Sequence, residues 1–258
     1  MNTLTSISSR IGSLWYGLIL PIKAFNTLLS NRSLLIWSIF PIGITLALYI
    51  FAIGWLASLL STLITSFTVY LGLSSTGWLI SSAVLLANFL AKILLIFLVA
   101  VTFSAVAGLV SCPFNDFLAE EAEKHTNPPL KQVESQSAII RLRLIAIDMA
   151  KTIAAIVLSI IALFLSWIPL LNIVAILITT LLLTFQYISY PQTRRNEGLA
   201  TSFQFLWRHF FACTGFGLAF LILFSIPFLA CAVLPVAVVA GTMLFARAQD
   251  GSGFQRLY

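Results

Sequence analysis

Residues 33–70 read SLLIWSIFPIGITLALYIFAIGWLASLLSTLITSFTVY and contain no charged side chain. The charge-free stretch continues to Ala91, just before Lys92. A soluble helix of this length would need polar residues along one face to meet water. About 20 consecutive apolar residues are enough for a helix to cross the hydrocarbon of a bilayer. The stretch therefore predicts a long transmembrane helix over residues 34–67.

A second long helix is predicted over residues 78–124, after an uncharged loop rich in Ser, Thr and Gly. Small residues at spacings of four, four and three would let another helix approach it closely in lipid. They are Ala100, Ser104, Gly108 and Ser111. Lys92 lies inside the apolar part of this helix, where it either marks a functional site or snorkels towards the outer interface.

The same helix becomes acidic beyond its apolar part. Asp116, Glu120 and Glu123 form a polar stripe, and Glu120 can pair with Lys124 one turn later. No histidine joins these carboxylates at ligand spacing, so the stripe does not resemble a metal site. We interpret it as a solvated helix face on a helix that continues past the membrane.

The N-terminal residues 11–29 predict an amphipathic helix that lies in the cytoplasmic interface of the membrane. Its apolar face is formed by Leu14, Leu18, Ile22 and Phe25. The alternative is a full span weakened by Pro21 and Lys23. No small-residue cleavage site follows the apolar run, so we expect no cleaved signal peptide.

The C-terminal half contains two apolar segments that each fold back at a proline. The first hairpin covers residues 139–190 with its tip at Pro169, and the second covers 203–247 with its tip at Pro227 and a further break at Pro235. The two tips resemble each other and suggest a weak repeat. Each arm is short for a span of about 20 residues. The sequence is compatible with two arrangements: hairpins that penetrate only part of the bilayer, and arms that each cross it fully.

The composition agrees with a single all-α integral membrane domain over residues 1–258, built from two long transmembrane helices, two proline-tipped hairpins and an interfacial helix. Hydrophobic residues make up 60% of the chain and charged residues 9%, and the mean hydropathy is +1.05. Soluble domains carry about 25% charged residues. The three cysteines show no metal-ligand spacing and are expected to be small buried side chains.

The net charge is +6, and the basic residues outside the apolar segments all fall on one side of this arrangement. They do not form the basic stripe that is typical of a nucleic-acid-binding protein. By the positive-inside rule, both termini are expected in the cytoplasm. These bases are Arg10, Lys23, Arg32, Lys124, Lys131, Arg141, Arg143, Lys151, Arg194, Arg195, Arg208, Arg247 and Arg256.

Three motifs in order resemble the CysZ-type sulfate permeases and the wider etoposide-induced-protein family. Residues 112–120 (CPFNDFLAE) are similar to the family's P-F-N-x-x-L-A-E, and residues 186–191 (QYISYP) to its Q-Y-x-x-Y-P. Residues 226–229 (IPFL) and 234–238 (LPVAV) are similar to its I-P-L-L and M-P-V-A-V. The resemblance implies two long helices with shorter hairpins, usually in an oligomer. It also implies sulfate entry for cysteine synthesis without an ATP-binding component.

The sequence departs from the resemblance at one place. The sulfate permeases have an adjacent arginine pair near the start of the first long helix, where this chain has Leu35 and Ile36. A dianion that leaves water needs positive charge or converging donors. The candidate anion-binding residues are therefore Arg32, Asn115, Arg194 and Arg195. The alternative is that these bases only orient the protein and contact anionic lipid.

The leading functional hypothesis is an anion permease for sulfate or a related oxyanion, in contact with membrane lipid and assembled as a homo-oligomer. The second hypothesis is a membrane scaffold that does not transport. We find no HExxH, GxSxG, P-loop or dinucleotide fingerprint, so no catalytic residues, cofactor or metal are expected.

Overall fold

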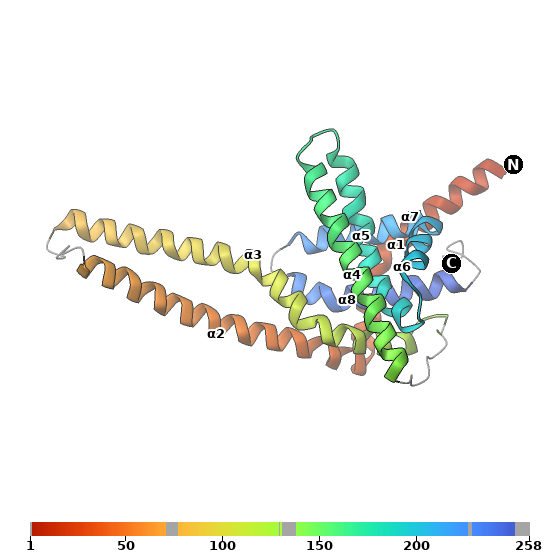
Figure 1. The fold of residues 1–258 in the computed structure, drawn as a ribbon, viewed down its shortest axis with the longest axis horizontal. Coiled ribbons are helices and arrows are strands. Elements are labelled where there is room, and N and C mark those ends of the chain that lie inside the picture. Colours follow the sequence, from red (N-terminus) through yellow and green to blue (C-terminus); the bar gives the residue numbers. More distant parts are fainter. Residues whose placement is uncertain (1, 71–76, 129, 131–137, 227–228, 251–258) are drawn as a thin grey trace.

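A computed structural model describes residues 2–70, 77–128, 130, 138–226 and 229–250 of the chain. The side chains of residues 2–8, 79–80, 83, 100–113, 138–142, 145 and 230–231 lie outside this description. The predicted all-α fold is confirmed (Figure 1). The helices are α1 (Asn2–Ser30), α2 (Arg32–Tyr70), α3 (Trp78–Lys124), α4 (Ala138–Ser166), α5 (Asn172–Arg194), α6 (Leu199–Arg208), α7 (Phe210–Phe224) and α8 (Leu229–Gln249).

Several of these helices are suited to a bilayer. Within the described residues, four segments are long and apolar enough to cross it: Arg32–Tyr70, Ala146–Ser166, Asn172–Arg194 and Ala232–Gln249. Helices α6 and α7 form a further apolar unit that bends by 95° at their junction. The chain is therefore built as a multi-pass membrane protein.

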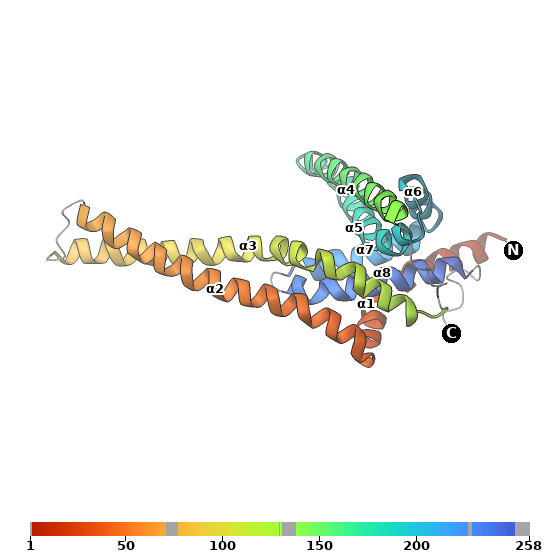
Figure 2. The same ribbon diagram turned by 60° about the horizontal axis from the view of Figure 1, so that its bottom comes forward.

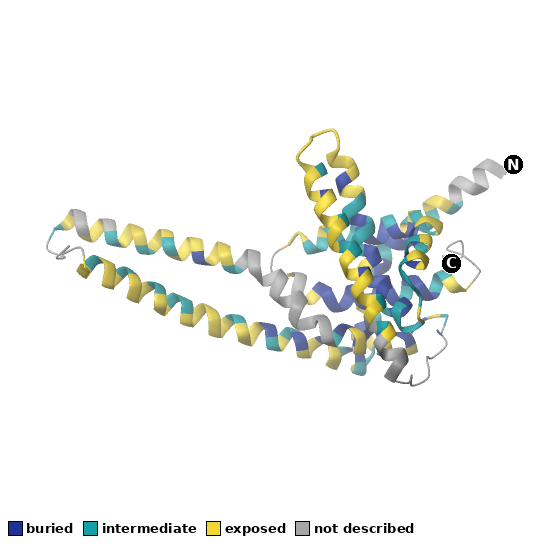
Figure 3. Ribbon diagram, in the orientation of Figure 1, coloured by how far each residue is buried: buried dark blue, intermediate teal, exposed yellow. Residues whose placement is uncertain are grey.

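Helices α2 and α3 pack side by side as a long pair that extends away from the other helices (Figures 1 and 2). Large apolar side chains are exposed along this pair, for example Phe51 at 75% and Phe97 at 65% (Figure 3). So much exposed apolar surface marks this pair as an interaction surface for a membrane or for another protein. Helix α3 has the predicted bounds, and α2 is slightly longer than predicted. Lys92 is exposed on α3 within this pair.

The small-residue stripe predicted on α3 lies outside the described side chains. It comprises Ala100, Ser104, Gly108 and Ser111, and its role in packing stays a prediction.

The core is formed where α1, α5, α7 and α8 pack against one another (Figure 3). Glycines on α7 bring its backbone against both neighbours. A Cβ atom built at Gly217 would overlap the carbonyl oxygen of Thr180 on α5, and one built at Gly215 would overlap that of Leu14 on α1. Close backbone approach through small residues is the usual way in which helices pack in lipid.

Helix α1 buries a different face from the one we expected to be apolar. Its buried side chains recur every fourth residue against α7 and α8, at Tyr16, Leu20, Ala24 and Leu28. In contrast, Ile22 and Phe25 are exposed. The hydropathy of α1 alone could not distinguish the face that contacts the core from the face that remains outside.

The first predicted hairpin is present as α4 and α5, with Pro169 in the turn between them, and it projects from the core (Figure 1). Helices α7 and α8 also pack against each other. The further break predicted at Pro235 is wrong, because Pro235 lies inside α8. Helix α8 is enclosed by α1, α3 and α5, and such neighbours help a helix to tolerate a proline. Pro227 lies outside the described residues.

Candidate functional site

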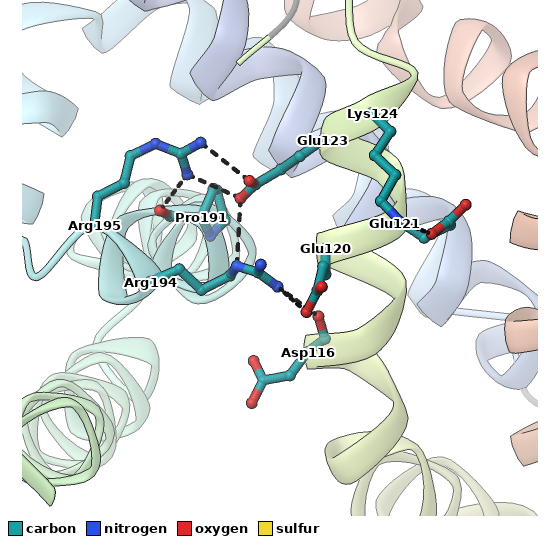
Figure 4. Close-up of polar contacts among 8 residues, drawn as sticks. All are labelled: Asp116, Glu120, Glu121, Glu123, Lys124, Pro191, Arg194 and Arg195. Carbon is teal, nitrogen blue, oxygen red and sulfur yellow. Dashed lines mark hydrogen bonds and ion pairs between the residues drawn. The ribbon is translucent and has the colours of Figure 1, made fainter. Parts of the chain in front are cut away.

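The C-terminal ends of α3 and α5 meet in a network of ion pairs (Figure 4). Helix α3 contributes Glu120 and Glu123, and α5 ends at Arg194, with Arg195 directly after it. Basic residues at the end of α5 also interact favourably with its helix dipole. The network therefore joins two segments that are more than 70 positions apart in the sequence.

Arg195 and Glu123 form the most buried pair in this network. Nη1 and Nη2 of Arg195 donate to the two carboxylate oxygens of Glu123, over 2.8 and 3.0 Å respectively. Arg195 Nη1 also donates to the carbonyl oxygen of Pro191 over 2.8 Å, and the guanidinium lies 5.5 Å from the centroid of the Phe245 ring. The Glu123 side chain is only 3% exposed. Such a two-pronged pair is strong and fixes the orientation of both groups.

Arg194 is more accessible than Arg195. Its Nη1 donates to a carboxylate oxygen of Glu120 over 3.0 Å, and to the backbone carbonyl oxygen of Asp116 over 3.4 Å. Its Nε lies 3.7 Å from the carboxylate of Glu123. Burial raises the pKa of the Asp116 carboxyl, and the negative charge of Asp148 raises it further, while Arg194 lowers it.

Two of the sequence motifs are in contact at this site. Asn115, from the P-F-N motif of α3, donates its side-chain amide to the hydroxyl of Tyr190, from the Q-Y-x-x-Y-P motif of α5, over 3.1 Å. Asn115 is 5% exposed. The helices that carry these two motifs are therefore in direct contact through motif residues.

The structure brings together three of the four candidate residues, Asn115, Arg194 and Arg195. Arg32 is exposed at the N-terminus of α2 and takes no part in the described contacts of this network. The two arginines are not open cations, because each already forms an ion pair with a carboxylate.

The predicted partners of the acidic stripe need two corrections. Lys124 forms its ion pair with Glu121 at 2.6 Å, whereas Glu120 is bound by Arg194. Glu123 is buried against Arg195 and is not part of a solvated face. Helical spacing alone predicted that Glu120 would pair with Lys124 on the same helix. In the structure Glu120 pairs instead with Arg194 of α5.

Lys151, which we expected only to help orient the protein in the membrane, is among the most deeply buried side chains that the structure describes. It is 2% exposed, and its Nζ donates to the hydroxyl of Thr193 over 3.1 Å. Glu197 lies in the connection from α5 to α6, and burial raises the pKa of its carboxyl while the charges of Lys151 and Arg195 lower it. No motif or spacing around Lys151 predicts that it packs against α5.

Several helices that are long and apolar enough to cross a membrane define a multi-pass membrane protein, with a polar cluster where the ends of α3 and α5 meet. Residues 20–235 match the family described as sulfate transporter CysZ/etoposide-induced protein 2.4, and the chain belongs to this family.

Similar proteins occur in three bacterial species. The chain is 29% identical over 173 residues to a protein of Pseudomonas paraeruginosa named sulfate transporter CysZ, covering 64% of this chain and 70% of that protein. It is also 29% identical over 164 residues to proteins of that name from Pseudomonas aeruginosa and Pectobacterium atrosepticum, covering 60% of this chain and 66% and 58% of those proteins.

Proposed function

We propose that this chain is an inner-membrane permease through which sulfate enters the cytoplasm and supplies cysteine biosynthesis. The observation that carries the proposal is its similarity to bacterial proteins named sulfate transporter. The basic end of α5 supports it, because an anion that leaves water needs compensating positive charge. We also propose that lipid surrounds α2 and α3, and that the protein assembles with copies of itself.

Within the network, we assign the contact with sulfate to Arg194. Its partner Glu120 is 53% exposed, and exposed ion pairs contribute about 1 kcal/mol or less. An anion can therefore replace Glu120 at low energetic cost, whereas Arg195 is held by the buried carboxylate of Glu123. Arg32 is a second candidate, since the N-terminus of a helix also favours anions. Asn115 supports the site through Tyr190.

Uptake of radiolabelled sulfate into proteoliposomes of the purified protein tests the function. We expect uptake above that of protein-free vesicles and competition by selenate, which has the same charge and shape, with phosphate tested alongside it. If the protein-containing vesicles take up no more sulfate than empty ones, the permease proposal fails.

Arg194→Gln is expected to lower sulfate uptake about 10- to 150-fold, because the loss of a charge-assisted hydrogen bond costs about 1.5–3 kcal/mol. Arg194→Lys should restore only part of the uptake, since a point charge lacks the planar fork of arginine. Arg208→Gln is the matched control, because Arg208 is exposed at the end of α6. Normal uptake by correctly inserted Arg194→Gln would remove this assignment.

We further propose that both termini lie in the cytoplasm. Topology reporters fused at Asn127, at Asn196 and after Tyr258 should therefore all report a cytoplasmic location, because the basic residues flank these positions. A periplasmic signal at Asn196 would mean that the α4–α5 hairpin does not return to its starting side.

One observation favours the alternative of a scaffold that does not transport. Arg194 and Arg195 both bind carboxylates, so the network also holds α3 against α5. The uptake experiment separates the two functions, because a scaffold would give no flux in the parent protein.

A further inference from the structure

Helices α4 and α5 carry polar side chains at every seventh position along the faces that meet. On α5 these side chains are Asn172, Thr179, Gln186 and Thr193, and on α4 they are Ser159 and Ser166. Seven residues make nearly two helical turns, so each set lies along one face of its helix. Polar groups inside membrane-crossing helices are costly, and they often mark the path of a substrate.

These side chains, except Thr193, line a groove of about 430 Å³ between the two helices, and Leu221 of α7 forms part of its wall. The groove is lined by Ser159, Ser166, Asn172, Thr179 and Gln186 among apolar neighbours. Its volume corresponds to roughly a dozen water molecules in the liquid. Both helices contain segments long enough to cross a bilayer, and the groove runs along these two helices.

The amide side chains of Asn172 and Gln186 indicate that the groove is not meant for lipid. Both residues are exposed where they border the groove, and neither amide has a hydrogen-bond partner among the side chains that the structure describes. An amide in hydrocarbon without a partner costs several kcal/mol, whereas water or an anion would satisfy its N–H groups.

A buried cation lies at the base of the hairpin. The ammonium of Lys151 donates to Thr193, the last member of the α5 series. No carboxylate in the described part of the chain lies within ion-pair distance of Lys151, although Asp148 and Glu197 attract it from further away. The positive charge of Lys151 is therefore less completely neutralised by nearby carboxylates than the charges of Arg194 and Arg195 are.

We propose that sulfate crosses the membrane along the α4–α5 groove and then meets the ammonium of Lys151, which lies outside the groove lining beside Thr193. The proposal rests on the proposed sulfate permease function. Neutral hydroxyl and amide donors bind an anion weakly enough for it to move on, while a single cation attracts it along the path. The Thr179 hydroxyl donates to the carbonyl of Ala175 in this structure, and rotation would let it donate to a passing anion.

Two substitutions test the path in proteoliposomes of the full chain. Lys151→Met is expected to lower sulfate uptake about tenfold or more, and Lys151→Arg should retain part of it. Thr179→Val removes one groove hydroxyl and should lower uptake by several-fold, on the order of one neutral hydrogen bond. Thr65→Val is its matched control, because Thr65 on α2 makes the same bond to its own helix, at the same 2.9 Å, outside the groove.

Thiol labelling gives a measurement that does not depend on the folding of the lysine variants. Thr179→Cys, treated after reconstitution with a negatively charged methanethiosulfonate reagent, should lose uptake, and sulfate should slow the labelling. Thr65→Cys and the parent, which carries the native cysteines, should show neither effect.

The outcomes separate the two proposals. If the parent transports sulfate but labelled Thr179→Cys transports normally, or is labelled at a rate that sulfate does not change, the groove is not the path. If the reagent does not reach Thr179→Cys at all, a second copy or lipid covers the groove and the path is again refuted. If the parent does not transport, the permease function itself fails.

Discussion

Glu123→Gln is expected to lower the free energy of unfolding by about 3–5 kcal/mol, because it leaves the guanidinium of Arg195 buried without its counter-charge. Both oxygens of the Glu123 carboxylate accept from Arg195, and the Glu123 side chain is 3% exposed. Titration of the detergent-solubilised protein with a denaturing detergent, followed by circular dichroism, would measure the change.

Glu120→Gln is the matched control, since Glu120 pairs with the neighbouring Arg194 but is 53% exposed. It should cost about 1 kcal/mol or less. Replacing both members of the buried pair, by Glu123→Leu with Arg195→Met, should recover much of the lost stability, because an apolar pair avoids the cost of desolvation. Equal effects of Glu123→Gln and Glu120→Gln would contradict the view that the buried pair holds α3 to α5.

Gly217→Leu is expected to prevent the native packing of α7, at a cost of about 3 kcal/mol or more. Overpacking typically costs about 1–3 kcal/mol where side chains can move aside. At Gly217 the added carbon meets the backbone carbonyl of Thr180, which moves only with the whole of α5. We expect most of the variant to be lost as aggregate in size-exclusion chromatography, and the remainder to melt at a lower temperature.

Gly54→Leu provides the comparison, because no atom lies within 4 Å of a Cβ atom built at Gly54 on α2. It adds the same side chain to an apolar helix and should leave elution and melting close to those of the parent. Similar melting of the Gly217 and Gly54 variants would show that α5 and α7 do not need backbone contact.

Much of the fold was predictable because its cause is local. The charge-free residues 33–70 and the turn at Pro169 are visible in the chain itself, and helix α3 has the predicted bounds. The error at Pro235 has a tertiary cause, since α8 continues through the proline where other helices enclose it. The bend between α6 and α7 was missed because no proline marks it, and Arg208 beside it was interpreted only as a determinant of orientation.

The candidate site was predictable in part for the same reason. Asn115, Arg194 and Arg195 belong to or follow recognisable motifs, and the structure brings them together. Their partners were not predictable, because Glu120 and Glu123 reach α5 across more than 70 positions. The burial of Lys151 likewise depends on which face of α4 meets α5.

The length of α2 has a consequence for the membrane itself. Its 39 residues rise about 58 Å, nearly twice the thickness of about 30 Å of a hydrocarbon core. Helix α2 is therefore too long to lie within that hydrocarbon along the membrane normal, and we expect it to tilt or to extend beyond it. The α4–α5 hairpin projects from the packed helices in a different direction, so the two helix pairs do not share one angle (Figure 1). We therefore expect the thickness of the bilayer to contribute to the energetics of the fold.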